Sequence, residues 1–177
     1  MPYAVELFLD PATEQRVRRI WERLAGIGIS YLHGSGSRPH VSLAVCDSID
    51  TDATIELLNR FAEDTSGFPI TFSSIGIFPA EQPVLFLAPK VTIPLLELHA
   101  SFMDSFEPMA TRIWPNYAPS EWIPHCTLAV ACPHECVEEA LSICREEILP
   151  FTAEIMEIGF VEFRPVKPLH SAALCQS

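Results

Sequence analysis

The sequence is short of basic residues, and this shortage excludes one class of partner. Its 177 residues hold 11 Lys and Arg against 23 Asp and Glu, a formal net charge of −12. The acidic excess lies after residue 48: residues 1–48 hold five basic and five acidic side chains, and the rest hold six and eighteen. Phosphate contacts dominate nucleic-acid affinity, and an acidic surface repels long polyanions. We therefore expect no long nucleic acid as a partner, although a small anion can still bind in a local pocket.

Long apolar runs are absent too. No uninterrupted stretch approaches the roughly 20 residues that cross a bilayer, so we expect no membrane partner. The first residues lack a basic segment followed by an apolar run, so we expect no signal peptide. Six cysteines without such a signal indicate reduced thiols rather than a disulfide framework. We therefore expect a cytoplasmic, monomeric protein that forms a single domain over residues 1–177.

Two short stretches are near-copies of each other. Residues 39–45 are Pro-His-Val-Ser-Leu-Ala-Val, and residues 124–130 are Pro-His-Cys-Thr-Leu-Ala-Val. An alternating run behind a proline predicts a β-strand, in which residues two apart share a face. One face of each strand is then predicted to form the floor of a cleft and the other to join the core. The predicted cleft faces carry His40, Ser42 and Ala44, and His125, Thr127 and Ala129; the predicted core faces carry Val41, Leu43 and Val45, and Cys126, Leu128 and Val130.

The elements around the two motifs repeat in the same order. Each half, about 1–80 and 81–177, is predicted as strand, helix, motif strand, helix, strand. The motif histidines are 85 positions apart, which is too far for a solenoid repeat of ~20–50 residues. The pattern therefore indicates a duplicated unit whose motif strands meet about a pseudo-twofold axis. The flanking strands are predicted at 3–9, 69–78, 84–88 and 151–163, and the helices at 11–25, 50–64, 92–112 and from Pro133 onward.

A pair of histidines, each beside a hydroxyl, is suited to displacement at phosphorus. The ordinary imidazole pKa of ~6.5 lets histidine take and give protons near neutrality. One histidine can then act as the base and the other as the acid. The hydroxyls of Ser42 and Thr127 can donate hydrogen bonds to the non-bridging phosphate oxygens. We expect this chemistry to require no metal and no cofactor.

The two copies resemble the His-x-Thr/Ser-x motifs of the two-histidine (2H) phosphoesterase superfamily, in its bacterial 2′–5′ RNA ligase and cyclic-nucleotide phosphodiesterase branch. The resemblance extends to the order of elements and to residues 75–78 followed by 84–87. It implies a bilobal α+β fold with mainly antiparallel sheets lining a central cleft and helices outside. It also implies metal-independent opening of 2′,3′-cyclic phosphates of nucleotides or RNA ends, with His40 and His125 catalytic and Ser42 and Thr127 phosphate-binding.

Alternatives remain open beside this interpretation. The chain is also compatible with a reversible 2′–5′ RNA ligase, or with a non-catalytic protein that binds a phosphorylated ligand. The expected partner is a small phosphodiester, a cyclic nucleotide or a short RNA end. Because the two motifs are equivalent, the sequence does not decide which histidine is the base; our working assignment takes His125 as base and His40 as acid.

Other side chains are candidates for substrate contact. Three cations are candidates to bind phosphate, and three aromatic residues are candidates to stack on a base at the rim of the cleft. For each of them a role on the surface or in the core is the competing interpretation. The cations are Arg38, Arg164 and Lys167, and the aromatic residues are Tyr31, Phe78 and Trp122.

Residues 132–136, Cys-Pro-His-Glu-Cys, are the one stretch that suggests a metal. Cysteine and histidine at close spacing are typical of zinc ligands, but no second close pair completes a four-ligand site. Cys136, Ala140 and Cys144 also fit the buried face of a helix. We therefore predict no metal site.

Overall fold

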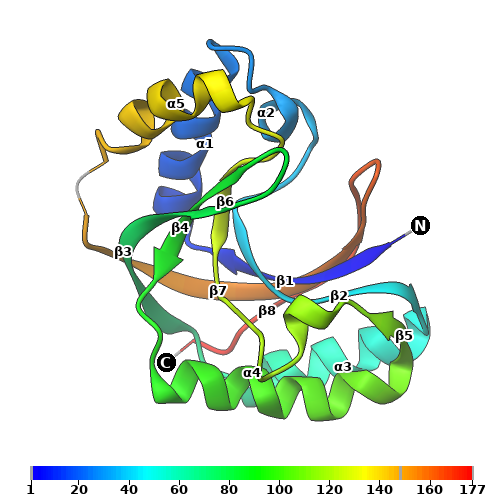
Figure 1. Ribbon diagram of the computed structural model, residues 1–177. Helices are drawn as coiled ribbons and strands as arrows, with labels where there is room; N and C mark the ends of the chain where they lie inside the picture. The colour runs from blue at the N-terminus through cyan, green and yellow to red at the C-terminus, as the bar shows by residue number, and fades with distance from the viewer. Residues whose placement is uncertain (1, 148, 177) are drawn as a thin grey trace.

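Eight strands form one continuous antiparallel sheet in the computed structural model, which describes residues 2–147 and 149–176 (Figure 1). The strand order is β5-β2-β1-β7-β3-β4-β6, with β8 paired to β7. The fold class is therefore the predicted α+β. We expected more than one sheet around the cleft, but the described residues form a single sheet, and its two ends take the place of separate sheets. Within the described residues no helix is both long enough and apolar enough to span a membrane.

The elements follow the predicted order over most of the chain. The strands are β1 (Tyr3–Leu9), β2 (His40–Ile49), β3 (Phe68–Phe78), β4 (Val84–Pro89), β5 (Ala110–Ile113), β6 (Cys126–Ala129), β7 (Phe151–Glu162) and β8 (Lys167–Ala173). The α-helices are α1 (Pro11–Ala25), α2 (Tyr31–Gly34), α3 (Thr51–Asp64), α4 (Ile93–Phe106) and α5 (Val137–Cys144). Three single 3₁₀ turns are η1 (Glu107–Met109), η2 (Pro115–Tyr117) and η3 (His134–Cys136).

Local sequence explains where the longer helices begin. The Asp10 carboxylate accepts the Thr13 backbone N–H at 2.9 Å, just before a proline in the first turn of α1. Asp50 caps α3 in the same way, through the Ala53 N–H at 3.1 Å. Each cap satisfies a backbone donor that has no partner within the helix. Apolar residues at helical spacing then pack α1 onto the sheet: Val17, Ile20, Trp21 and Leu24 are all buried.

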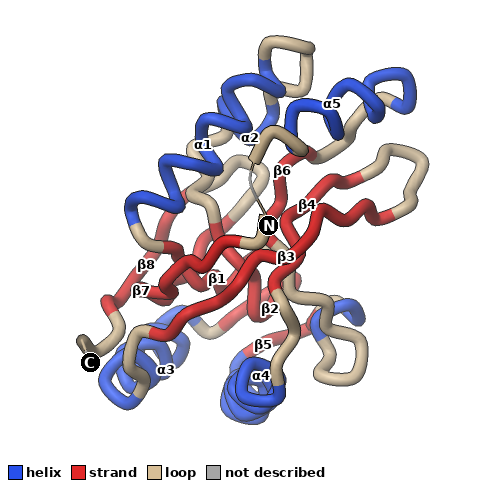
Figure 2. Tube along the Cα trace, turned by 90° about the vertical axis from the view of Figure 1, so that its left-hand side faces the viewer, coloured by secondary structure: helices blue, strands red, loops and turns tan. Residues whose placement is uncertain are grey.

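The strand order is symmetric about the β7–β3 pair, and the two halves of the chain exchange elements across it. β1 pairs with β7 from the second half and carries β2 on its other edge, while β4 pairs with β3 from the first half and carries β6 on its other edge. The helices follow the same exchange, since α1 packs on β6 and α5, and α4 packs on β2 and α3. Figures 1 and 2 show these two helix pairs on opposite sides of the sheet. Each motif strand is therefore supported by a helix from the other half.

Two predicted boundaries are wrong. The helix expected at 92–112 ends at Phe106, and the short edge strand β5 follows and pairs with β2. Pro108 explains the break because it lacks an N–H and its ring clashes with the preceding helical turn. The strand predicted at 151–163 is β7, which ends at Glu162, but it is not the last strand as predicted, because β8 follows and returns along it.

A β-bulge in β2 changes which side chains face the cleft. Glu6 pairs with Ser42 but Val5 pairs with Ala44, so Leu43 is an extra residue on β2. An extra residue breaks the two-residue alternation of a strand. The prediction that Ala44 lies on the cleft face is therefore wrong: Ala44 lies in the core, and Val45 lines the cavity.

The second motif strand carries the same bulge at the equivalent position. Phe86 pairs with Thr127 but Leu85 pairs with Ala129, so Leu128 is the extra residue. Ala129 is accordingly buried in the core, and Val130 lines the cavity in its place. The predicted cleft position of Ala129 is wrong for the same reason as that of Ala44.

Candidate active site

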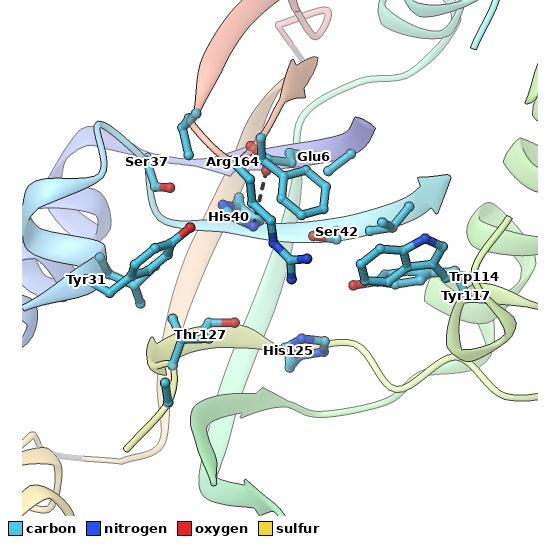
Figure 3. A pocket seen from close by; sticks show the side chains of 17 residues that line it. Glu6, Tyr31, Ser37, His40, Ser42, Trp114, Tyr117, His125, Thr127 and Arg164 are labelled. Atoms are coloured by element: carbon cyan, nitrogen blue, oxygen red, sulfur yellow. Dashed lines mark ion pairs between the residues drawn. The ribbon is translucent and has the colours of Figure 1, made fainter. Parts of the chain in front are cut away.

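The four motif side chains line one cavity of about 460 Å³ between β2 and β6. Figure 3 shows His40 and Ser42 on one wall and His125 and Thr127 on the wall facing it. The two strands lie against each other, with residues of β2 in contact with residues of β6. The tertiary fold therefore brings together two motifs that lie far apart in the sequence.

Both catalytic candidates are held in the same tautomer. The Nδ1–H of His40 donates to the Arg38 carbonyl at 2.7 Å, and that of His125 donates to the Ile123 carbonyl at 2.7 Å. A backbone carbonyl only accepts hydrogen bonds, so in each ring Nδ1 carries a hydrogen. This leaves Nε2 of each imidazole for proton transfer in the cavity.

Side chains of the other half fix the carbonyls of both motif strands. The Trp21 indole N–H donates to the Thr127 carbonyl at 3.1 Å, and the Trp122 indole N–H donates to the Ser42 carbonyl at 3.0 Å. His99 donates from Nε2 to the next carbonyl, Leu43, at 2.9 Å. These bonds to the backbone support each His-x-hydroxyl pair from behind the cavity wall.

Trp122 does not lie at the rim of the cleft, where we expected it. Its side chain is only 6% exposed and stacks on His99 with ring centroids 3.9 Å apart. The residues that line the cavity, as far as the described chain forms it, do not include Trp122. A large apolar ring whose N–H finds a buried carbonyl belongs in the core, so Trp122 supports Ser42 from behind.

Arg38 and Phe78 also lie outside the cavity wall formed by the described residues. The Arg38 guanidinium pairs with Glu157 at 2.9 Å and with Glu14 at 3.4 Å, so its charge is already matched by two carboxylates. Phe78 packs its ring edge-on against His125, with centroids 5.0 Å apart. Both residues adjoin a catalytic candidate, but neither faces the cavity. Lys167 is exposed on β8 and likewise is not in that wall.

Arg164 and Tyr31 do line the cavity. Among the described lining residues Arg164 is the only Lys or Arg, and Figure 3 shows its guanidinium pointing between the two motif strands. Arg164 adopts φ +70° in the loop between β7 and β8, a conformation that non-glycine residues seldom take and that is often found at functional sites. Tyr31, which is 52% exposed, stands at the mouth of the cavity.

Sequence reasoning missed an acidic residue at the base of the cavity. Glu6 is 6% exposed, and its Oε1 lies 3.4 Å from Nε2 of His40. Burial raises the pKa of the Glu6 carboxyl, while His40 and Arg38 oppose that rise. The sequence did contain a signal for Glu6, because it is the one charged residue in the apolar run Ala-Val-Glu-Leu-Phe-Leu at 4–9. A carboxylate buried in such a strand is rare without a partner.

The loop before β6 supplies further lining residues that the sequence did not reveal. Trp114 and Tyr117 lie at one end of the cavity (Figure 3), and Ser37, from the loop before β2, also lines it. Burial raises the Tyr117 pKa, and the Ser42 side chain beside its hydroxyl opposes that rise. This part of the chain is irregular, so neither helical nor strand periodicity indicated which way its side chains point.

The two histidines sit in different electrostatic surroundings. Burial lowers the pKa of His125, and the nearby charge of His40 lowers it further, against the opposing bond to the Ile123 carbonyl. The rings of Phe78 and Phe86 pack edge-on against His125, with centroids 5.0 and 5.4 Å away. His40 instead faces the Glu6 carboxylate. The neutral form of His125 is therefore favoured at neutral pH.

The cysteines of residues 132–136 and their neighbours do not form a ligand cluster. Across residues 2–147 and 149–176, no group of three or more His, Cys, Asp or Glu is placed to hold a metal ion. All six cysteines are free thiols, and burial raises the pKa of Cys144 to about 12. A buried thiol of this kind behaves as a small apolar side chain.

The fold and the facing His-x-hydroxyl strands are those of the two-histidine phosphoesterase superfamily, whose members are phosphoesterases or RNA ligases. The sequence model of the 2′–5′ RNA ligase superfamily matches residues 9–166, and the chain belongs to that family. A comparison with curated proteins found no match.

Three solved structures are similar in fold. Escherichia coli LigT in its apo form is 17% identical with a TM-score of 0.59, over 99% of this chain and 98% of that one. TT0787 of Thermus thermophilus is 14% identical with a TM-score of 0.61, over 98% of each chain. Kluyveromyces marxianus Usb1 is 13% identical with a TM-score of 0.50, over 95% of this chain and 97% of that one.

Proposed function

We propose that this protein is a metal-independent phosphodiesterase that opens 2′,3′-cyclic phosphates of nucleotides or of short RNA ends. One observation carries the proposal: two imidazoles, each with Nδ1–H bonded to a backbone carbonyl, face one cavity that also holds two hydroxyls. Such a pair supplies one acceptor and one donor of a proton on the two sides of a phosphate.

The reaction balances with water as the only co-reactant. One imidazole Nε2 takes a proton from water as the water oxygen bonds to phosphorus. The bond from phosphorus to one ribose oxygen breaks, and that oxygen takes a proton from Nε2 of the protonated imidazole. The hydroxyls of Ser42 and Thr127 donate to the non-bridging oxygens, where negative charge increases in the transition state. The product is a phosphomonoester with a free ribose hydroxyl.

The cavity fits a small substrate with one phosphodiester. Its volume of about 460 Å³ lies within the range of roughly 300–1,000 Å³ typical of small-ligand sites. Arg164 is the only lysine or arginine among its described lining residues, which suits a cyclic phosphate with a single negative charge. E. coli LigT, a neighbour in fold, has been crystallised with 3′-AMP and with phosphate, and these ligands share the chemistry of the proposed product.

The direct test is turnover of the four 2′,3′-cyclic mononucleotides, followed by 31P NMR. The cyclic phosphate resonance should convert to that of a monoester, and the 2′- or 3′-monoester formed identifies the bond that breaks. His40→Ala and His125→Ala are matched controls for a contaminating activity. A wild-type protein that binds the cyclic nucleotides without converting them would contradict the proposal and support a non-catalytic binding protein.

Two further arms separate the alternatives. Dialysis against EDTA should leave turnover intact, because both proton transfers are assigned to imidazoles. A 2′–5′-linked dinucleotide offered alone tests the ligase alternative, since a reversible ligase would cleave it to a 2′,3′-cyclic phosphate and a free 5′-hydroxyl.

Affinity for a long RNA should exceed affinity for a cyclic mononucleotide by little, because the net charge of the protein is −12. A cytoplasmic location and a monomeric state complete the proposal.

A further inference from the structure

Glu6 and Phe86 occupy equivalent places in the two ends of the sheet. Glu6 of β1 pairs with Ser42 and borders the bulge in β2; Phe86 of β4 pairs with Thr127 and borders the bulge in β6. Residues directly opposite in an antiparallel pair share a face of the sheet. The pseudo-twofold arrangement thus sets a carboxylate beside the first motif and a phenyl ring beside the second.

We propose that Glu6 is a positioning residue that keeps His40 protonated and so makes it the acid, whereas Phe86 keeps His125 neutral and so makes it the base. The inference rests on the proposed function, and it assigns roles that the two equivalent sequence motifs leave open. Its geometric basis is the 3.4 Å separation of Glu6 Oε1 and His40 Nε2, set against the edge-on contact of Phe86 with His125.

The ion pair does not remove the proton from use. A separation of 3.4 Å exceeds the roughly 2.7–3.2 Å of an ordinary hydrogen bond to nitrogen. The Nε2 proton of His40 therefore remains available to a ribose oxygen entering the cavity, while the carboxylate balances the imidazolium charge. Because Glu6 is buried, the pair is weakly screened by solvent and salt.

Other charged or titratable groups around the pair do not reproduce this asymmetry. Arg38, which precedes β2, acts on Glu6 but is itself paired with Glu14 of α1 and Glu157 of β7. Tyr117 of η2 lies beside Ser42, and Arg164 enters from the loop between β7 and β8. On β7, the residue opposite Glu6 is Gly159, which has no side chain to offer. Glu6 is the only carboxylate among the described lining residues.

During turnover the charges exchange between the two rings. His125 gains the proton of the attacking water, and His40 gives its proton to the leaving ribose oxygen. After product leaves, solvent returns one proton to the Glu6–His40 pair and removes one from His125. The net change over a cycle is zero on the protein, so Glu6 is needed as a fixed negative charge and not as a proton donor to substrate.

The test is 15N NMR of ring-labelled histidines in the free protein at pH 7, with resonances assigned through His40→Gln and His125→Gln. Ring nitrogen shifts distinguish an imidazolium from a neutral Nδ1–H tautomer. We expect an imidazolium for His40 and the neutral tautomer for His125. In Glu6→Gln, which keeps the side-chain shape, His40 should become neutral. Glu154→Gln, an exposed carboxylate on β7, is the matched control and should change neither ring.

Kinetics give the second readout. The alkaline limb of the kcat/KM profile should move to lower pH in Glu6→Gln, with at least ~10-fold loss at pH 8, and Glu6→Asp should recover part of it. The proposal would be overturned, whatever the substrate is, if both rings had the same protonation state in the wild type. It would also be overturned if His40 stayed an imidazolium in Glu6→Gln. If the rings differ as expected but no cyclic phosphate is hydrolysed, the proposed function fails and the assignment of Glu6 to charge His40 stands.

Discussion

The indole N–H of Trp21 donates a 3.1 Å hydrogen bond to the carbonyl of Thr127, 106 positions further along the chain. Trp21 belongs to α1 in the first half, and Thr127 belongs to the motif strand of the second. Trp122 of the second half supports Ser42 of the first in the opposite sense, at 3.0 Å. Neither half can therefore place its own motif strand without the other, which predicts that folding and assembly of the site occur together.

Trp21→Phe should destabilise the protein and weaken catalysis. The phenyl ring fills most of the space but leaves the Thr127 carbonyl without its partner, a loss of about 1–3 kcal/mol in the free energy of unfolding. Urea unfolding measures it. Trp114→Phe is the stability control: it removes an indole bond to Asp47, whose half-exposed carboxylate can bond water instead, so its cost should stay below ~1 kcal/mol. Equal losses in both variants would contradict the supporting role of Trp21.

His40→Ala and His125→Ala should each lower kcat by ~10²–10⁴-fold, because each removes one proton-transfer partner. The double variant should lose less than the product of the single losses, since both groups act on one transition state. Single-turnover rates with a cyclic mononucleotide measure the effect. Near-full activity in either single variant would exclude the two-histidine mechanism.

Ser42→Ala and Thr127→Val should each cost about 10–10³-fold, less than loss of a histidine, by removing one donor to the developing charge. The effect should fall on kcat more than on KM, since the interaction strengthens in the transition state. Tyr117→Phe tests whether the Tyr117 hydroxyl beside Ser42 orients the Ser42 hydroxyl, and it should lower kcat. A change confined to KM would reassign the hydroxyls to ground-state binding.

Glu6→Gln should stabilise the folded protein at neutral and alkaline pH even as it impairs the site. Burial holds the Glu6 pKa above its usual value of 4.5, so as pH rises the unfolded chain ionises first, and its free energy falls relative to that of the folded chain. Each unit of elevation is worth ~1.4 kcal/mol. The advantage of Gln should therefore be present above the raised pKa and vanish below pH ~4.5, where the carboxyl is protonated in both states. Urea unfolding from pH 4 to 8 measures it, and a wild type more stable than the variant at pH 8 would contradict it.

The motif chemistry could be predicted from the sequence because it is local. Each histidine and its hydroxyl sit two apart in a strand, and strand geometry alone places them on one face. Helix starts at Asp10 and Asp50 were also predictable, because a capping side chain reaches only three residues ahead. Periodicity predicted most elements for the same reason, and failed where Pro108 ended α4 early and β5 followed.

The composition of the cavity was not predictable in this way. The bulges at Leu43 and Leu128 depend on how β1 and β4 pair with the motif strands, and they exchange the predicted Ala44 and Ala129 for Val45 and Val130 at the cavity wall. Arg38 looked like a phosphate ligand by its position before His40, but carboxylates from α1 and β7 already hold it. Such pairing is set by partners distant in sequence, which no local pattern encodes.

By itself, then, the sequence determined which side chains could carry out acid/base chemistry at phosphorus and that they occur twice. Only the tertiary structure decided how the two copies differ. The motifs are nearly identical as strings of residues, and their difference arises from the neighbouring strand: β1 presents Glu6 to His40, and β4 presents Phe86 to His125. The charge state of an imidazole depends on burial and on charges within a few ångströms, and those are properties of the fold.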